Sequence, residues 1–362
     1  MAGTDILQVI TDTDRRGAQV FAVDLHDALA GRGHDLRTVA LSSGRHGDLL
    51  DLPVLGASWR TWEAMSALRH EMARARVVVA HGSSTLPACA IAGVGGVAPF
   101  VYRQIADSLF WASTPARRLR VRLFLRQARS VVALWTGAAR VLSERFGLDE
   151  RRIEIIPNGV PASRCPVVDP GDRPVARARF GLHPHSPTLL YIGALVPEKG
   201  ADAAIRALAG CEECQLLVVG AGPEYGALRA LAGAVAPARV VFAGPVDHPA
   251  NAFAAADIVV LPSRGGDSMP GVLIEAGLSG LPAVATSVGG IPAIVRAEVT
   301  GEIVAPDDEV QLVAAIRRAL HRADRYGRAA RQHCLEHFEI DAVAAQWDRL
   351  LTSMLEGAAA DG

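Results

Sequence analysis

Residues 189–200 of the chain read Leu-Leu-Tyr-Ile-Gly-Ala-Leu-Val-Pro-Glu-Lys-Gly. The first four residues form an apolar run typical of a buried strand, Gly193 begins a turn, and a helical pattern starts at Ala201. Lys199 therefore follows a strand and comes just before a helix. A lysine in this place can bind a phosphate, whose negative charge the helix N-terminus also stabilises. The alternative interpretation is a solvated lysine in a loop.

The same alternation of apolar strands and helical segments runs through the whole chain of 362 residues. In the first half, strands are predicted at 6–10, 36–41, 77–80, 100–102 and 153–156. In the second half, they are predicted at 189–192, 216–219, 240–242, 258–261 and 283–285. Two such series predict two Rossmann-like α/β domains with parallel sheets. Such domains bind ligands at the carboxyl ends of their strands, and two of them facing each other would share a cleft.

The domain boundaries follow from this pattern. We expect an N-terminal, acceptor-side domain over residues 1–165 and a C-terminal domain over residues 180–340. Segment 161–187 is rich in proline, glycine and charged residues and is the expected linker. The last helical pattern, at 342–358, lies beyond the second series of units, and we expect it to pack back on the first domain.

The composition excludes several classes of protein. With 37 basic and 38 acidic residues, the net charge of −1 argues against a general nucleic-acid binder. Hydrophobic residues make up 50% of the chain and no low-complexity tract occurs, which argues against disorder. The uncharged stretch 83–102 is interrupted by Pro87, Pro99 and several glycines, so we expect a soluble helix, turn and strand there. The start of the chain lacks the pattern of a secretory signal.

The cysteines and the lysine are the informative rare residues. The five cysteines are scattered, which suits the reducing cytoplasm, and a cytoplasmic protein is predicted. They are Cys89, Cys165, Cys211, Cys214 and Cys334. No second CxxC or histidine pair follows Cys211 and Cys214 at zinc-finger spacing, so no metal site is predicted. The basic residues comprise 36 arginines and a single lysine, Lys199.

A second informative stretch, residues 261–276, reads Leu-Pro-Ser-Arg-Gly-Gly-Asp-Ser-Met-Pro-Gly-Val-Leu-Ile-Glu-Ala. Pro270 and Gly271 stand where a helix would start, which leaves backbone N–H groups pointing outward. Glu275 lies in a mostly apolar part of that helix, so its carboxylate needs polar partners, and paired ribose hydroxyls would supply them. Asp267 precedes it by eight residues. The alternative is an acid near a helix N-terminus and a glutamate in a salt bridge.

Together these motifs resemble the retaining GT-B glycosyltransferases of family 4, also called glycosyl transferases group 1. The matching segments follow in family order over residues 155–305. They are 155–160, 193–200, 218–223, 241–244, 262–264, 267–275, 280–286, 289–292 and 300–301. Looser matches in the first half are 16–19, 33–35 and 79–82. The resemblance implies two Rossmann-like domains across a cleft, and transfer of a sugar from a nucleotide-diphosphate donor without metal or other cofactor.

The resemblance also implies roles for individual residues. Lys199 corresponds to the lysine that holds the donor diphosphate, and Glu275 to the acid that accepts hydrogen bonds from the ribose. Asp267 takes the place of the acid that touches the donor sugar. Lys199 and Asp267 are therefore candidate catalytic residues. The backbone around Pro270, Gly271 and Val272 would surround phosphate or sugar oxygens, although Pro270 has no N–H to donate.

The first half contributes fewer candidates. Gly17, at the turn before a helix, would let the backbone approach the phosphates. His81 follows a strand and is a third candidate catalytic residue, although packing or capping would equally explain it. The family often has an arginine where this chain has Ala194, so we expect another cation from one of three arginines. These are Arg264, which we place in the donor site, Arg16 and Arg103.

Two further departures bear on specificity. The family's first acid is usually glutamate, so the shorter Asp267 could alter the preference for a sugar. Many members carry a histidine near the position of Ile105, which leaves the handling of the acceptor open. The absent arginine and histidine also motivate an alternative, a catalytically silent relative that acts as a binding protein. A sugar-nucleotide epimerase of similar architecture is a further alternative.

Other enzyme classes fit less well. Residues 219–226 resemble a dinucleotide-binding loop, but the third glycine is displaced by one position and no acid ends the next strand, so NAD is not expected. Asp12-Thr-Asp14 has the form of a metal-binding DxD motif, but it precedes the Gly17 turn of a GT-B-like domain, where the chemistry needs no metal. A phosphorylase would need a lysine for pyridoxal phosphate, and the single lysine already has a place in the phosphate loop.

The charge is unevenly distributed. Residues 1–172 contain 21 arginines and 17 acidic residues, whereas residues 173–362 contain 16 basic and 21 acidic residues. Segment 103–129 holds seven arginines and one acid. An apolar stripe of Val121, Phe124, Leu125 and Ala128 beside them suggests a basic amphipathic helix. It predicts peripheral contact with the inner face of an anionic membrane, or with a lipid-phosphate acceptor. The alternative is a packed helix with solvated arginines; the acceptor could equally be a glycan or a small molecule.

Overall fold

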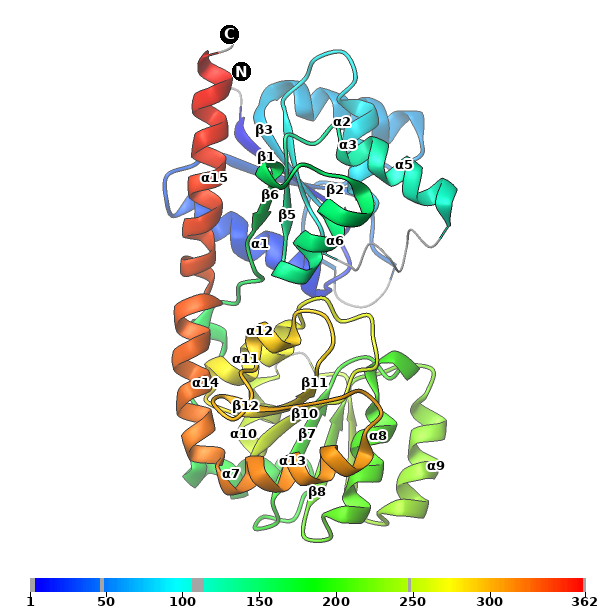
Figure 1. The fold of residues 1–362 in the computed structure, drawn as a ribbon, viewed down its shortest axis with the longest axis vertical. Helices are drawn as coiled ribbons and strands as arrows, with labels where there is room; N and C mark the ends of the chain where they lie inside the picture. The colour runs from blue at the N-terminus through cyan, green and yellow to red at the C-terminus, as the bar shows by residue number, and fades with distance from the viewer. Residues whose placement is uncertain (1–3, 46–48, 106–113, 247–248, 361–362) are drawn as a thin grey trace. The chain divides into compact units, whose positions relative to one another are not determined.

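The computed structural model describes residues 4–45, 49–105, 114–246 and 249–360 (Figure 1). The chain divides into two compact units. Unit 1 comprises Met1–Gly159 together with Ile340–Gly362, and unit 2 comprises Val160–Glu339. Each unit contains a six-stranded sheet whose neighbouring strands are parallel. The two parallel α/β domains predicted from the alternating pattern are confirmed.

In unit 1 the strands follow the order β2-β1-β3-β4-β5-β6. They are β1 (Thr4–Asp12), β2 (Leu36–Ser42), β3 (Ala75–His81), β4 (Phe100–Arg103), β5 (Ser130–Ala133) and β6 (Ile153–Ile155). The helices are α1 (Gly17–Ala30), α2 (Trp62–Arg74), α3 (Thr85–Ala92), α5 (Pro115–Leu125), α6 (Thr136–Phe146) and α15 (Ile340–Ala360), with a 3-10 turn η1 (Glu150–Arg152). The central strands are continuous apolar runs because helices cover both faces of a parallel sheet. In β3, for example, Val77 through Ala80 are fully buried.

Helix α15 belongs to unit 1 although it ends the chain. It packs against α1. Its Val343, Trp347 and Leu351 are fully buried in one cluster with Leu25 of α1 and Val79 of β3. The sheet of unit 1 is therefore covered by a segment from the far end of the sequence (Figure 1).

In unit 2 the strands follow the order β12-β11-β10-β7-β8-β9. They are β7 (Thr188–Ile192), β8 (Gln215–Val219), β9 (Val240–Gly244), β10 (Ile258–Leu261), β11 (Ala283–Thr286) and β12 (Gly301–Val304). The helices are α7 (Arg173–Arg179), α8 (Ala201–Ala207), α9 (Tyr225–Val235), α10 (Ala250–Ala255), α11 (Gly271–Leu278), α12 (Ile291–Ile294), α13 (Glu309–His321) and α14 (Ala323–His337). Short 3-10 turns are η2 (Ala162–Arg164), η3 (Pro170–Asp172), η4 (Pro197–Lys199) and η5 (Leu208–Gly210).

Three features differ from the expectations. Strand β5 was not among the predicted strands, although all four of its residues are buried. Segment 161–187 is not a free linker: it belongs to unit 2 and contains α7, whose buried Arg177 donates to Asp257 over 2.6 Å. The sixth strand, β12, was not expected because Glu302 interrupts its short apolar run. The structure satisfies that buried carboxylate with Tyr326 and Arg318, each at 2.9 Å.

The uncharged stretch 83–102 forms α3, a turn and β4, as the prolines and glycines predicted. In the described part of the chain, no helix combines the length and apolar character needed to cross a membrane.

Candidate functional site

The candidate site lies at the carboxyl ends of β7 and β10, which are neighbours in the sheet of unit 2. Lys199 ends the turn η4 after β7, and Asp267 lies in the loop between β10 and α11. Because the strands are adjacent and parallel, the two loops meet, and Lys199 Nζ forms an ion pair with an Asp267 carboxylate oxygen. The Lys199 side chain stays 26% exposed, whereas that of Asp267 is 5% exposed.

Asp267 is held from several directions. Its second carboxylate oxygen accepts a hydrogen bond from Ser263 Oγ. The carbonyl of Ser263 in turn accepts from Thr286 Oγ1 at 2.5 Å. A Cβ on Gly289, which has φ +53°, would lie 1.8 Å from the Asp267 carbonyl oxygen. Only glycine permits this close approach, so the backbone around Asp267 is fixed and its carboxylate is preorganised.

The loop that carries Lys199 is fixed against the same neighbour. Gly200 has φ +69°, and a Cβ there would lie 2.1 Å from the Pro262 carbonyl oxygen. The backbone N–H of Arg264 donates to the carbonyl of Glu198 at 2.8 Å. The β7 and β10 loops therefore form one assembly that sets the position of Lys199.

Arg264, which the sequence analysis places in the donor site, is paired with carboxylates of its own unit. Its guanidinium makes a bidentate contact with Asp202, at 2.7 and 2.8 Å, and its Nε donates to Asp307 at 2.6 Å. It also donates to the carbonyl of Pro197 at 2.9 Å. These carboxylates raise the pKa of Arg264 and neutralise its charge. The arginine is paired with two carboxylates and contacts turn η4, whereas Lys199 is paired with one carboxylate, that of Asp267.

Helix α11 supplies the third part of the site. Pro270 is its N-cap residue, and no side chain caps it. The N–H groups of the first turn of any helix lack partners within the helix, and here that turn contains Gly271 and Val272, both half-buried. Glu275 follows one turn later and is also half-buried. Burial of the Cys165 thiol is the main cause that raises its pKa to about 12, and the negative charge of Glu275 is the second cause. The Glu275 carboxylate therefore lies near that thiol.

A cavity of about 270 Å³ lies in unit 1, at the carboxyl ends of β1 and β3. Gln19, His81 and Arg16 are among the residues that line it. Gly17 begins α1 beside Arg16, and a Cβ on it would meet no atom within 4 Å. Arg16 is 60% exposed and is paired with Asp12 at 2.5 Å.

His81 is buried, and both of its ring nitrogens have partners. Nε2 lies 2.8 Å from Gln8 Oε1, and Nδ1 lies 3.4 Å from Arg103 Nη1. Because Arg103 can only donate, Nδ1 accepts and Nε2 carries the proton. Burial and then Arg103 lower the pKa of His81 well below its ordinary value. This geometry favours the packing interpretation of His81 over a catalytic one.

Arg103 is fully buried as well, with its guanidinium 3.8 Å from the centre of the Phe21 ring. It donates to Asn158 Oδ1, and burial lowers its pKa to about 9. Arg103 therefore fixes the segment that leaves β6 and is not exposed for a ligand. Neither Gln8 nor Asn158 was singled out from the sequence, since their partners are far away along the chain.

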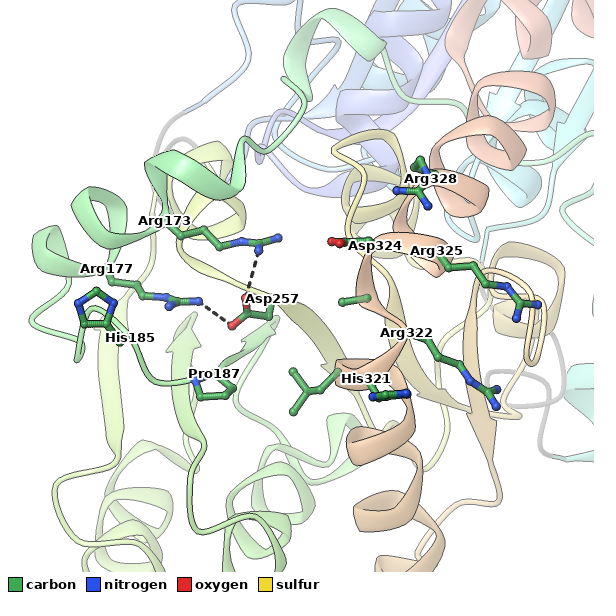
Figure 2. Close-up of a pocket in the computed structure, with 12 residues that line it drawn as sticks. Arg173, Arg177, His185, Pro187, Asp257, His321, Arg322, Asp324, Arg325 and Arg328 are labelled. Atoms are coloured by element: carbon green, nitrogen blue, oxygen red, sulfur yellow. Dashed lines mark hydrogen bonds and ion pairs between the residues drawn. The ribbon is translucent and has the colours of Figure 1, made fainter.

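A larger cavity, of about 610 Å³, lies at the opposite end of the strands of unit 2 (Figure 2). Pro187 and Asp257, which line it, come just before β7 and β10. Asp257 binds Arg177 at 2.6 Å and Arg173 at 3.3 Å. Ligands of open α/β sheets bind at the carboxyl ends of the strands, so this cavity is not the candidate site. In the described residues, no group of three side chains is arranged to hold a metal ion.

The comparison with known families accounts for both units. Residues 15–164 match the model described as Glycosyltransferase Family 4, and residues 186–322 match the model described as Glycosyl transferases group 1. Two glycosyltransferase family models thus match the chain, one over much of unit 1 and one within unit 2. Lys199 and Glu275 both lie within the second matched segment, residues 186–322.

Relatives with a curated name support the same relationship. The chain is 34% identical over 245 residues to a D-inositol 3-phosphate glycosyltransferase of Geodermatophilus obscurus, an alignment that covers 63% of this chain and 52% of the relative. A protein of the same name from Mycobacterium bovis is 32% identical over 233 residues, which cover 60% of this chain and 48% of the relative. The matched region thus spans about half the length of these relatives.

Solved structures share the fold over nearly the full chain. Anabaena HepE in complex with UDP-glucose has a TM-score of 0.84 at 20% identity, covering 97% of this chain and all of the other. Sucrose-phosphate synthase from Thermosynechococcus elongatus has a TM-score of 0.82 at 20% identity, covering 98% of this chain and all of the other. The glycosyltransferase fold GT-B expected from the motifs is therefore confirmed.

Proposed function

We propose that the protein transfers a sugar from a nucleotide-diphosphate donor to an acceptor hydroxyl with retention of anomeric configuration. The observation that carries the proposal is the convergence of Lys199, Asp267 and the uncapped N-terminus of α11 in unit 2. The family relationship of both domains supports it. Neighbouring structures solved with UDP and UDP-glucose make a UDP-sugar the first donor to test.

The chemistry requires stabilisation of a departing diphosphate. The bond between the sugar C1 and the phosphate oxygen breaks, and the acceptor oxygen forms a new bond to C1. The acceptor proton passes to the leaving phosphate, so no separate carboxylate base is needed. Negative charge grows on the diphosphate, and Lys199 together with the first-turn N–H groups of α11 would stabilise it.

The contacts of Lys199 suit this role. An ammonium group has three N–H donors, and one of them binds Asp267. The other donors can bind phosphate oxygens while the ion pair keeps the side chain in place. Since Arg264 is paired with two carboxylates and Lys199 with one, Lys199 would carry more of the charge stabilisation from this loop pair.

Asp267 and Glu275 would orient the two ends of the donor. The buried carboxylate of Asp267 is preorganised to accept hydrogen bonds from sugar hydroxyls, and Glu275 would accept them from the ribose. The shorter Asp267 makes the choice of sugar a property to determine with several donors. The curated relatives make inositol 3-phosphate the first acceptor to test.

The test is nucleotide release from a panel of UDP-, GDP- and ADP-sugars, with and without inositol 3-phosphate. We expect Lys199→Ala to lower turnover about 10²–10³-fold, the size expected for one group that stabilises transition-state charge. Arg229→Ala, which removes an exposed cation of α9, should leave turnover unchanged. Near-normal turnover of Lys199→Ala would refute the assignment.

The same assay separates the alternatives. A silent relative would bind a nucleotide sugar, seen as a thermal shift, but release no nucleotide with any donor. An epimerase would convert the nucleotide sugar itself without an acceptor. Proton NMR of the product reports the anomeric configuration, and an inverted product would rule out retention. Turnover should also persist in EDTA, because we propose no metal.

A further inference from the structure

Cys211 and Cys214 form a pair that the proposed sugar transfer does not use. They flank the turn between η5 and β8, where the N–H of Cys214 donates to the carbonyl of Cys211 at 3.1 Å. Residues at the two ends of such a turn have Cα atoms less than ~7 Å apart. A disulfide usually needs a Cα separation of about 4.4–6.8 Å, so this turn suits one without a large rearrangement.

The turn is held in this shape by Arg239. Its guanidinium donates to the carbonyls of Cys211 at 3.0 Å, Cys214 at 3.1 Å and Leu208 at 3.1 Å. Both thiols are buried, at 0% and 1% exposure, but the two residues between them, Glu212 and Glu213, are exposed. The sulfur atoms therefore lie directly beneath a surface turn.

The two thiols are not equivalent. The neighbouring Cys214 thiol is the main cause that lowers the pKa of Cys211 below its ordinary value, with Arg317 contributing. The Cys211 thiol and burial in turn raise the pKa of Cys214. Cys211 is thus the better thiolate and Cys214 the hydrogen-bond donor beside it. A lowered pKa increases the fraction of thiolate, which is the form of cysteine that attacks disulfides.

The other three cysteines provide an internal contrast. Burial raises the pKa of Cys89, Cys165 and Cys334 to about 12 in each case. All five cysteines are free thiols in this structure. Of the five cysteines, Cys211 is thus the one whose pKa is lowered.

We propose that Cys211 and Cys214 are a modification site that forms a reversible disulfide by exchange with a small-molecule disulfide. The Cys211 thiolate attacks one sulfur of the small molecule and releases one thiolate. Cys214 then loses its proton to solvent and attacks Cys211 Sγ, which releases the second thiolate. The protein dithiol is oxidised by two electrons, and the small disulfide is reduced to two thiols.

Oxidised glutathione serves as the probe, with intact mass and peptide mapping as readouts. We expect the wild-type protein to lose two hydrogens in mass, with the bond mapped to Cys211–Cys214 and reversed by dithiothreitol. Cys334→Ser is the matched control and should behave like the wild type. An unchanged mass, or modification spread equally over Cys89, Cys165 and Cys334, would overturn the proposal.

Single variants test the order of attack. Cys214→Ser should accumulate a mixed disulfide with glutathione at Cys211, because no second thiol resolves it. Cys211→Ser should form at least tenfold less adduct at Cys214, whose thiol is protonated. If Cys214 formed more adduct than Cys211, the assigned roles would be wrong. Peptide mapping of the wild-type protein shows whether the disulfide forms, even if a variant fails to fold. None of these readouts depends on the proposed sugar transfer.

Discussion

At the scale of single residues, the candidate site depends on glycines as much as on charged side chains. Gly200 and Gly289 allow neighbouring backbones to approach at distances that a Cβ would prevent. The sequence placed both glycines within motif segments, but their partners, Pro262 and Asp267, could be named only from the structure. The ion pairs of Arg264 with Asp202 and Asp307 could not be predicted from the sequence either, because these residues lie 62 and 43 positions away from it.

Gly289→Ala tests whether this packing sets the site. The added Cβ would overlap the Asp267 carbonyl, and φ +53° disfavours alanine, so we expect a loss of about 2 kcal/mol in stability and weaker donor binding. Gly265→Ala is the control, since a Cβ there meets nothing within 4 Å and its backbone is ordinary. Urea denaturation and nucleotide titration provide the readouts. Equal effects of the two substitutions would contradict the argument.

At the scale of elements, most buried strands were predicted, with β5 as an exception, whereas elements that contain partnered polar residues were not. The strands β7 and β10 are short apolar runs, and their order in an α/β domain implied that Lys199 and Asp267 lie at one edge. Strand β12 was not predicted because Glu302 interrupts its apolar run, and the partners that allow this carboxylate to be buried, Arg318 and Tyr326, are visible only in the structure. Helix α7 escaped notice because it has only seven residues, within a proline-rich segment.

Helix α5 corrects part of the membrane prediction. Val121, Leu125 and Ala128 of the expected lipid-binding stripe are buried in the core of unit 1, so this stripe is a packing face. A second apolar pair, Leu119 at 59% and Leu123 at 50% exposure, lies among the arginines of α5. Contact with a membrane, if it uses α5, must therefore use this pair.

We expect the protein to float with phosphatidylglycerol vesicles at low salt and to dissociate as salt screens the arginines. Leu119→Gln/Leu123→Gln should reduce binding several-fold, because it removes the apolar contacts. Val167→Gln/Val310→Gln, at positions 59% and 82% exposed in unit 2, should not. Absence of flotation by the wild-type protein would remove the membrane from the list of partners.

At the scale of the whole molecule, the chain enters unit 1 twice. It leaves after Gly159 and returns at Ile340, so that α15 completes a core begun more than 300 residues earlier. The helical period of the last segment predicted a helix there. Its role in covering α1 and β3 depends on Trp347, which is fully buried beside His81 at a ring separation of 6.3 Å.

Trp347→Ala tests this dependence. Removal of a fully buried indole leaves a cavity and should cost about 3–5 kcal/mol, and the loss should fall on unit 1. Hydrogen exchange should therefore accelerate in β3 and α1 while β7 and β10 keep their protection, and UDP should still shift the melting of unit 2. Trp62→Ala, at a position 86% exposed, is the matched control and should change little. Equal loss of protection in both sheets would show that α15 stabilises the two units as one cooperative structure.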